Sequence, residues 1–383
     1  MDAPSPEHIC TVFSNLKALK ILGQGAMGTV FLVHDTKQDP EASVPFALKV
    51  VEKSAMQDKS NAEGRARWEV QVLSRTTSCP HPFLPRLLSS YLFESSEYLA
   101  WSLPFCPGGD LNALRYRQCD GVFSVSVARF YLAEILLGLE HLHELGIVYR
   151  DLKPENVLVQ SSGHVTLTDF DLSRSLNKSS ANDHIAAASP ARDRNKTNNF
   201  LKRAKSARVS PVKPGFGERS YSFVGTDEYL SPEVVRGDGH EFAVDWWALG
   251  ILAYEMIYGS TPFKGRNRKE TLWNVLNKKP VFVAKRSDMT DLIDRLLHKD
   301  PTRRLGYLHG AWEIKNHPYF QSVQWDLLTS LHRAPFIPSV EDDDHSLSAC
   351  RCEGFDIREY FVSRRATSSP SRFSHRDDTF PQF

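Results

Sequence analysis

The sequence of 383 residues predicts an α+β fold with two lobes, a small β-rich lobe followed by a larger helical one. Three short runs with strand character, at 19–25, 29–35 and 46–52, are separated by Gly, Asp and Pro. Residues 122–143 show the apolar spacing of a long helix, and most periodicity beyond Val234 is helical. A hydrophobic fraction of 41% in a chain of this length is enough for one two-lobed unit or two ordinary domains.

The segments around these lobes differ in composition. We expect an N-terminal extension at 1–15, a small lobe at 16–103 and a large lobe at 107–320. Within the large lobe, a stretch at about 175–219 has ten Lys or Arg residues against three acids, which predicts a basic, disordered insert. A tail at 321–383 has an acidic run, a Ser-rich patch and an aromatic end.

Charge and cysteine content exclude several classes of protein. The net charge of +1 gives no global field that would attract nucleic acid or membrane. The first residues lack a signal-peptide pattern, and the longest apolar stretch, near 248–257, is too short to span a bilayer. Six cysteines without a CxxC spacing predict a reducing, intracellular setting.

A glycine-rich motif, G-x-G-x-x-G-x-V, follows the first predicted strand. Glycine lets the backbone approach phosphate groups closely and adopt positive φ. The same glycines begin a helix in dinucleotide-binding proteins, but here the chain continues as a strand. This arrangement predicts a flap over ATP. The residues expected to bind ATP are Leu22, Gly23, Gln24, Gly25, Ala26, Met27, Gly28, Thr29 and Val30.

Lys49, on the third predicted strand, is the candidate for gripping the α- and β-phosphates of ATP. Its ammonium group needs a carboxylate from a helix, and the helix expected at 61–76 offers Glu69 as the first candidate and Glu63 as the second. Taken singly, each of these residues is more typical of ordinary surface charge. The prediction therefore depends on their order in the chain.

The most specific motif is Y-R-D-L-K-P-E-N at 149–156, with T-D-F-D shortly after it. Asp151 can accept the proton of a substrate hydroxyl, and Lys153 can neutralise charge on the transferred phosphoryl group. Asn156 and Asp169 supply oxygen ligands for Mg²⁺, with Mn²⁺ as a substitute. Phosphoryl transfer needs positioning and charge neutralisation more than covalent chemistry, so these groups fit it well. The alternative is a degenerate enzyme that kept the motifs.

Together these motifs resemble the signature set of protein kinases over roughly 16–338. Tyr149 in place of His, and the A-P-F-I-P motif at 334–338, resemble the AGC group of serine/threonine kinases. The D-F-D motif and the insert after it resemble the plant-specific AGC subfamily (AGC VIII), and the size and tail are most similar to its oxidative-signal-inducible and UNICORN-like branch. The resemblance implies a bilobal protein-kinase fold, a catalytic domain at 16–320, and ATP-dependent serine/threonine phosphorylation.

Asp171 stands where many kinases have glycine after Phe170. Glycine would permit the motif to flip, whereas an aspartate makes the flipped conformation costlier. We therefore expect this kinase to adopt the flipped inactive state rarely, and inhibitors that require that state to bind poorly.

By resemblance, residues 222–233 are the end of an activation segment. Ser222 lies where the activating phosphate is attached, and Arg150 is placed to pair with it. An exposed loop serine is the alternative. Thr226 is expected to contact both Asp151 and the incoming substrate, which favours serine or threonine over tyrosine as the acceptor.

The resemblance also implies contacts that support the fold and the adenine site. Glu233 is expected to pair with Arg304, and Asp245 to brace the catalytic loop. Pro104 in the hinge has no backbone N–H, so the N–H of Cys106 is expected to bind adenine.

Three carboxylates suggest the substrate preference. By resemblance, Asp110, Glu155 and Glu255 lie where related kinases bind arginines N-terminal to the acceptor hydroxyl, which favours basic peptides. In the alternative, Asp110 only holds the ATP ribose and Glu255 only contacts a neighbouring segment of the chain.

The sequence ends in Phe380-Pro-Gln-Phe383, which resembles the AGC hydrophobic motif. By resemblance, this motif packs on the small lobe of its own kinase or docks on the upstream phosphoinositide-dependent kinase that phosphorylates the activation loop. Phe355, earlier in the tail, is a candidate to cover the adenine. Phenylalanines that end the chain by chance are the alternative.

The basic insert has three interpretations: a nuclear-import signal around 202–208, contact with an anionic membrane, or a solvated linker with phosphorylation sites. The expected location is accordingly the cytoplasm, the nucleus or the periphery of the plasma membrane. No nucleic-acid partner is expected, because the basic run is short and lacks interleaved aromatics. A catalytically weak kinase-fold scaffold is the alternative function, and the intact set Lys49, Asp151, Asn156 and Asp169 argues for the enzyme.

Overall fold

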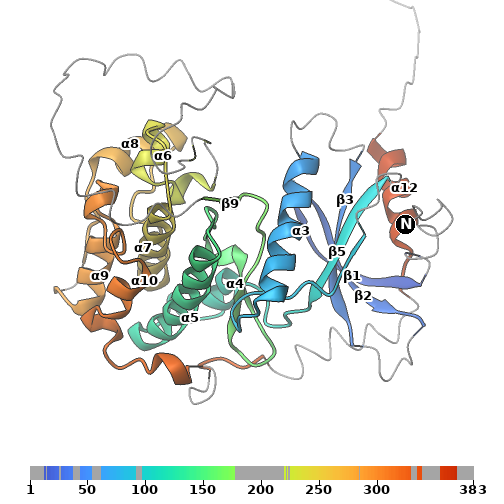
Figure 1. Ribbon diagram of the computed structural model, residues 1–383, viewed down its shortest axis with the longest axis horizontal. Coiled ribbons are helices and arrows are strands. Elements are labelled where there is room, and N and C mark those ends of the chain that lie inside the picture. The colour runs from blue at the N-terminus through green and yellow to red at the C-terminus, as the bar shows by residue number, and fades with distance from the viewer. Residues whose placement is uncertain are drawn as a thin grey trace, which may run out of the picture. The chain divides into compact units, whose positions relative to one another are not determined.

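The computed structural model describes two compact units of the chain. The first is drawn from the chain up to Asp110, from Leu158–Asp171 and from Ala334 onward; the second comprises Leu111–Val157 and Leu172–Arg333. A β-rich first unit and a helical second unit confirm the predicted α+β kinase fold (Figure 1). The described residues are 13, 15–25, 27–37, 44–53, 62–91, 97–176, 220, 222, 225–283, 285–328, 334–338 and 354–368.

A five-stranded antiparallel sheet forms the centre of the first unit. In spatial order its strands are β1 (Leu16–Gly25), β2 (Gly28–Asp35), β3 (Phe46–Glu52), β5 (Tyr98–Pro104) and β4 (Ser89–Tyr91). Side chains alternate between the two faces of a strand, so Leu48 and Val50 point to one face and Lys49 to the other. The sheet therefore has two different surfaces to cover.

Two helices cover these surfaces (Figure 1). Helix α3 (Ala62–Ser78) lies on the face of Lys49 and buries Ala66, Val70 and Leu73 at helical spacing. Helix α12 (Ile357–Ser368), from the tail, lies on the opposite face. Its buried residues Ile357 and Phe361 join the core cluster that contains Phe31, Leu48 and Val50. The core of the first unit thus includes the tail.

Phe355 begins this tail contact. Its backbone N–H donates to the carbonyl of Ala18 at 2.9 Å and its carbonyl accepts from the Ala18 N–H at 3.0 Å. Its ring lies edge-on to that of Phe31 at 6.1 Å between centroids. Because Phe31 belongs to the face opposite Lys49, the expectation that Phe355 covers adenine is wrong.

The second unit is built around α7 (Ala243–Tyr258), which is buried along nearly its whole length. Helix α7 packs against α5 (Val125–Glu144) and α9 (Asp288–Leu296). The hydroxyl of Ser124 accepts from the N–H of Val127 at 3.3 Å and so caps α5. The described part of this unit also contains α4 (Leu111–Tyr116), α6 (Pro232–Arg236), α8 (Arg268–Asn277) and α10 (Ala311–Lys315).

Short elements position the sequence motifs. Strand β6 (Ile147–Val148) pairs with β9 (Arg174–Ser175), and β7 (Val157–Val159) pairs with β8 (Val165–Leu167). Among the described residues the 3₁₀ turns are η1 (Pro154–Asn156), η4 (Asp227–Tyr229), η5 (Pro301–Arg303), η6 (Pro318–Phe320) and η7 (Trp325–Leu327). Across the part of the chain that the structure describes, every helix is too short or too polar to cross a membrane.

The contact of α12 with the sheet should stabilise the first unit measurably. Phe361 is 3% exposed, so Phe361→Ala should lower the free energy of unfolding by about 3 kcal/mol through lost burial and a cavity. The next residue, Val362, is 60% exposed, and Val362→Ala should change that free energy by less than about 0.5 kcal/mol. Urea unfolding followed by circular dichroism measures both; similar losses would show that α12 does not pack on the sheet.

Candidate active site

The glycine-rich flap connects β1 and β2. At Gly28 φ is +136°, and a Cβ there would lie 2.4 Å from the carbonyl oxygen of Val50, so only glycine fits. A Cβ at Gly23 or Gly25 would meet nothing within 4 Å, which leaves open space beside the backbone for phosphate groups. The other predicted ATP-binding residues of the flap lie on these strand ends (Leu22, Gln24, Thr29 and Val30) or in the turn between them (Met27). Ala26 lies outside the described residues.

Lys49 lies between two carboxylates of the first unit. Its Nζ donates to Oε2 of Glu69 at 2.7 Å and to Oδ1 of Asp169 at 2.8 Å. The contact with Glu69 is the one expected from the sequence, while Glu63 instead pairs with Arg67 on the same helix. Burial disfavours the ammonium group, but the two carboxylates outweigh it and raise the pKa of Lys49, so the cation persists at neutral pH.

Asp169 offers its carboxylate to a cation. Its side chain is 36% exposed, and its φ of +59° is in the left-handed region, which aspartate tolerates better than most residues. A carboxylate of this exposure, beside a fixed ammonium group, fits the oxygen ligation that Mg²⁺ prefers.

Asp171 forms an ion pair with Arg65 of α3. The Asp171 side chain is 3% exposed; burial and the nearby Asp169 raise the pKa of its carboxyl, while Lys49 and Arg65 oppose that shift. Helix α3 is thus tied to the D-F-D motif by Arg65 as well as through Glu69 and Lys49. The sequence motif indicated a conformational role for Asp171 but not its partner, although Arg65 precedes Glu69 by one helical turn.

The two partners of this pair should respond unequally to mutation. Arg65→Met leaves a buried carboxylate unpaired and should lower the free energy of unfolding by about 3 kcal/mol. Asp171→Asn leaves Arg65, whose side chain is 37% exposed, free to be hydrated and should cost about 1 kcal/mol. Arg67→Met, on the exposed side of α3, is the matched control and should cost less than about 0.5 kcal/mol. Urea unfolding that ranks Arg67→Met with Arg65→Met would contradict the pairing.

Asp151 is the centre of a polar cluster in the second unit. Its Oδ2 accepts from Nζ of Lys153 and from Nδ2 of Asn156, both at 2.8 Å. The hydroxyl of Thr226 lies 3.4 Å from Oδ1 and 3.3 Å from Nζ of Lys153. The structure therefore brings together four residues that the sequence nominated from two separate motifs.

Asn156 is oriented by its own amide group. The Nδ2 also donates to the backbone carbonyl of Asp151 at 2.8 Å, so both bonds of this side chain use its NH₂. Its Oδ1 remains available as an oxygen ligand, which fits the predicted metal-binding role. Of the two expected ligands, Asn156 belongs to the second unit and Asp169 to the first.

Two buried carboxylates make the contacts that the sequence predicted. The Asp245 carboxylate is fully buried and accepts from the backbone N–H groups of Tyr149 and Arg150, each at 2.8 Å. The guanidinium of Arg304 binds both carboxylate oxygens of Glu233, at 2.6 and 2.8 Å. Such bidentate pairs fix geometry as well as adding energy.

Ser222 lies within a group of basic side chains. Nη1 of Arg150 donates to Oγ of Ser222 at 2.6 Å and to Oγ of Ser220 at 2.9 Å. Arg174 donates to the same Ser220 hydroxyl at 3.4 Å, and the Nε2 of His240 lies 3.5 Å from Arg150. Two guanidinium groups beside these serines form a site suited to a phosphate group.

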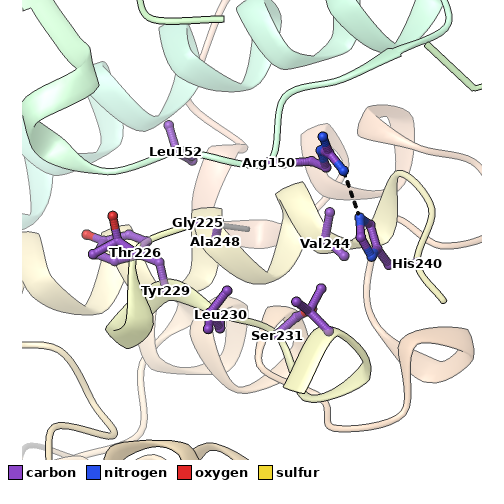
Figure 2. A pocket seen from close by; sticks show the side chains of 11 residues that line it. Arg150, Leu152, Gly225, Thr226, Tyr229, Leu230, Ser231, His240, Val244 and Ala248 are labelled. Carbon is purple, nitrogen blue, oxygen red and sulfur yellow. Dashed lines mark hydrogen bonds between the residues drawn. The ribbon is translucent and has the colours of Figure 1, made fainter. Parts of the chain in front are cut away.

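A small cavity adjoins this group (Figure 2). Its volume is about 20 Å³, enough for roughly one water molecule, so it is not a substrate site. Arg150 and His240 line one end of it, where a dashed line joins them in Figure 2. Burial, with a further contribution from Arg150, lowers the pKa of His240 to about 4, so this ring is neutral at pH 7.

The neutral state of His240 predicts a pH dependence of stability. His240 has a pKa of about 4 in the folded state and the ordinary histidine value of 6.5 in the unfolded chain. Between these pH values the unfolded chain binds the proton more strongly, so lowering the pH favours unfolding. Stability should fall by roughly 2–3 kcal/mol as pH drops through this window because of His240. In His240→Gln, the slope of unfolding free energy against pH should flatten there, and in the exposed control His309→Gln it should not. An unchanged slope in His240→Gln would refute the assignment.

The predicted substrate-binding carboxylates differ in their contacts. Glu155 is exposed and accepts from Nδ2 of Asn112 at 3.0 Å. Glu255 accepts from Nη2 of Arg115 at 3.4 Å and from the hydroxyl of Tyr229 at 2.6 Å, which favours the alternative that it contacts a neighbouring segment.

The remaining residues and segments singled out from the sequence lie in other parts of the chain. Asp110 belongs to the first unit, where it pairs as an isolated bridge with Leu158. Burial raises the pKa of the Cys106 thiol to about 12, so this hinge cysteine is a poor nucleophile at neutral pH. Phe380 and Phe383 lie outside the described residues, as do residues 177–219 of the insert expected at about 175–219. Its first residue, Ser175, belongs to strand β9.

Comparisons with known proteins agree with this geometry. The protein kinase domain family matches residues 16–201 and 205–320. The serine/threonine-protein kinase UCN of Arabidopsis thaliana is 56% identical, over 93% of this chain and 91% of the relative. UCNL is 53% identical, over 99% and 98%, and OXI1 is 41% identical, over 86% and 80%; both are serine/threonine-protein kinases of the same plant.

The chain therefore belongs to the protein kinase family. Within that family it is a serine/threonine kinase of the plant AGC type, in the group that includes UCN, UCNL and OXI1, as the sequence motifs predicted. Membership of the family implies the use of ATP and a divalent metal ion, and protein substrates.

Proposed function

We propose that this chain is an active serine/threonine kinase that uses Mg·ATP, phosphorylates basic protein substrates in plant intracellular signalling, and is switched on by phosphorylation of Ser222. The observation that carries the proposal is the cluster around Asp151, because an inactive relative has no need to keep Lys153, Asn156 and Thr226 on one carboxylate. Mn²⁺ is expected to substitute for Mg²⁺.

Asp151 is the group that handles the acceptor hydroxyl. Among the described residues, two donors hold its Oδ2, while Oδ1 has only the longer contact with Thr226, so Oδ1 is the oxygen available to a substrate hydroxyl. Hydrogen bonding orients the substrate oxygen and gives its proton an acceptor as the bond to phosphorus forms. Thr226 borders this position and contributes to the selection of serine or threonine.

Lys153 and Lys49 supply positive charge from the two units. Lys153 lies 2.8 Å from Asp151 and is placed to neutralise charge on the transferred group. Lys49, held by Glu69, binds phosphate oxygens under the glycine flap. Bound Mg·ATP supplies the phosphoryl group, and Asp169 and Asn156 would hold the metal ion.

Activation is proposed to act through the Ser222 site. The Ser222 hydroxyl already contacts Arg150, the neighbour of Asp151 in the chain, so a phosphate there would bind the same guanidinium more strongly. The upstream enzyme would be a phosphoinositide-dependent kinase that docks on Phe380 and Phe383. The basic insert is a candidate contact for an anionic membrane or an import factor, with the protein in the cytoplasm, the nucleus or at the plasma membrane.

The proposal is tested by transfer of radiolabelled phosphate from Mg·ATP to a basic peptide. The wild type should label the peptide, and Asp169→Asn should reduce the rate at least 100-fold because a metal ligand is lost. After treatment with the upstream kinase, Ser222→Ala and Phe383→Ala should fail to gain activity. Ser220→Ala is the matched control for Ser222, since Ser220 contacts the same Arg150 but is fully buried, and it should still be activated.

A silent wild type, even after that treatment, would overturn the enzyme proposal in favour of the kinase-fold scaffold. Equal activation of Ser222→Ala and wild type would overturn the switch alone.

A further inference from the structure

Trp101 lies beside Lys49 in the sheet of the first unit. Strand β5 is the neighbour of β3 (Figure 1), and Trp101 is the residue directly opposite Lys49 in their antiparallel register. Residues opposite each other on adjacent strands have their side chains on the same face, so the indole and the ammonium group share the face of α3. Nζ of Lys49 lies over the Trp101 ring, 5.4 Å from its centroid. The ring is therefore a third partner of Lys49, besides Glu69 and Asp169.

The ring holds the cation in a different way from the two carboxylates. An ammonium group has three N–H donors, and Glu69 and Asp169 each accept one of them, at 2.7 and 2.8 Å. The face of an indole attracts a cation through its quadrupole, so it needs no hydrogen-bond donor aimed at it. Trp101 can thus fix the position of Lys49 while the third N–H stays available for a phosphate oxygen. A third carboxylate would occupy that donor and cancel the charge that binds phosphate.

The surroundings of Lys49 make this contact strong. Trp101 is fully buried, and the side chains of Lys49 and Glu69 are 12% and 1% exposed. A cation–π contact gains strength when water is excluded, because water no longer screens the charge. Asp169 is also the expected metal ligand, so Glu69 and Trp101 are the two partners of Lys49 without a second role.

Packing alone does not account for the tryptophan at position 101. Among the described residues, Nε1 of Trp101 is buried without a hydrogen-bond partner. An unpaired buried donor lowers stability, and a phenylalanine in the same place would fill most of the volume without that cost. The advantage of the indole here is that its ring attracts a cation more strongly than a phenyl ring does.

We propose that Trp101 is a positioning residue for phosphoryl transfer, whose ring face holds the Lys49 ammonium beside Glu69 so that one N–H is free to bind a phosphate oxygen of ATP. This inference deepens the proposed function and rests on it, because Lys49 is the phosphate-binding residue of that kinase. Trp101 acts through Lys49, so nucleotide affinity depends on a residue outside the glycine flap, the hinge and the D-F-D motif.

Calorimetric titration with nucleotide tests the proposal without phosphate transfer. Mg·ADP is the probe, since it keeps the α- and β-phosphates that Lys49 is proposed to bind, and adenosine is the control ligand that lacks them. Trp101→Met should weaken the binding of Mg·ADP about tenfold, the effect of losing one buried cation–π contact, and change the binding of adenosine less than about twofold.

Trp101→Phe is the matched variant, because phenylalanine is close to methionine in size but has a ring face. Its affinity for Mg·ADP should stay within about threefold of the wild type. Equal losses in Trp101→Met and Trp101→Phe, or equal losses for Mg·ADP and adenosine, would overturn the proposal in favour of a packing role.

A double-mutant cycle with Lys49 separates positioning from a general packing defect. In the background of Lys49→Met, the further change Trp101→Met should alter the affinity for Mg·ADP less than about twofold, because the residue it acts through is gone. A loss as large as in the wild-type background would show that Trp101 affects nucleotide binding without Lys49, and would refute the proposal.

Fluorinated tryptophan covers the case in which Trp101→Met melts before the assay temperature. Site-specific incorporation of mono-, di- and trifluorinated tryptophan at position 101 keeps the shape of the ring and reduces the negative charge of its face step by step. The affinity for Mg·ADP should fall along this series, while that for adenosine should stay constant. A series without a trend for Mg·ADP would contradict the contact between ring and ammonium.

The outcomes separate this inference from the proposed function. A wild type that binds Mg·ADP with the expected dependence on Trp101 but transfers no phosphate to the basic peptide would overturn the kinase activity and retain the assignment of Trp101. Normal phosphate transfer, with the same affinity for Mg·ADP in Trp101→Met and wild type, would overturn the assignment alone. A wild type that binds no Mg·ADP would overturn both.

Discussion

Asp245 is fully buried, and its carboxylate accepts hydrogen bonds from the backbone N–H groups of Tyr149 and Arg150, with Nε2 of His143 at 2.7 Å. These contacts hold Arg150 at a φ of +70°, a conformation that is unfavourable for a side chain of this size. The next residue is Asp151, so its direction is set by the same backbone. The side chain of Arg150 reaches Ser222, so the cluster around Asp151 and the proposed activation site both depend on one buried carboxylate.

Much of this arrangement could be predicted from the sequence, because phosphoryl transfer restricts residue types over short spacings. The motif at 149–156 contains Asp151, Lys153 and Asn156 within one loop, and a loop of that length has few ways to separate them. The pair of Lys49 and Glu69 was predictable for a different reason, since a buried lysine requires a counter-ion and the helix after it offered only two carboxylates. Residues that act together in one short loop lie close in the sequence, so a sequence motif can reveal them.

The contacts that escaped prediction are those that chain connectivity does not constrain. Arg115 and Glu255 meet from two helices far apart in the sequence, and no motif spacing links them. The partner of Asp171 was missed for the same reason. Phe355 was a candidate to cover adenine, but the burial of Ile357 and Phe361 on the face of the sheet opposite Lys49 decided its place. Packing between distant segments depends on shape and burial, which a single sequence records poorly.

The tail helix has a consequence for how the protein is made. The first unit takes residues from three stretches, and the last of them follows the whole second unit. On the ribosome, the sheet emerges early, yet Ile357 and Phe361 appear only after more than two hundred further residues have been added. Until then Phe31 and Leu48 lack their final cover, so the usual order in which an N-terminal domain folds first does not apply. The nascent chain therefore exposes this apolar surface through most of its synthesis.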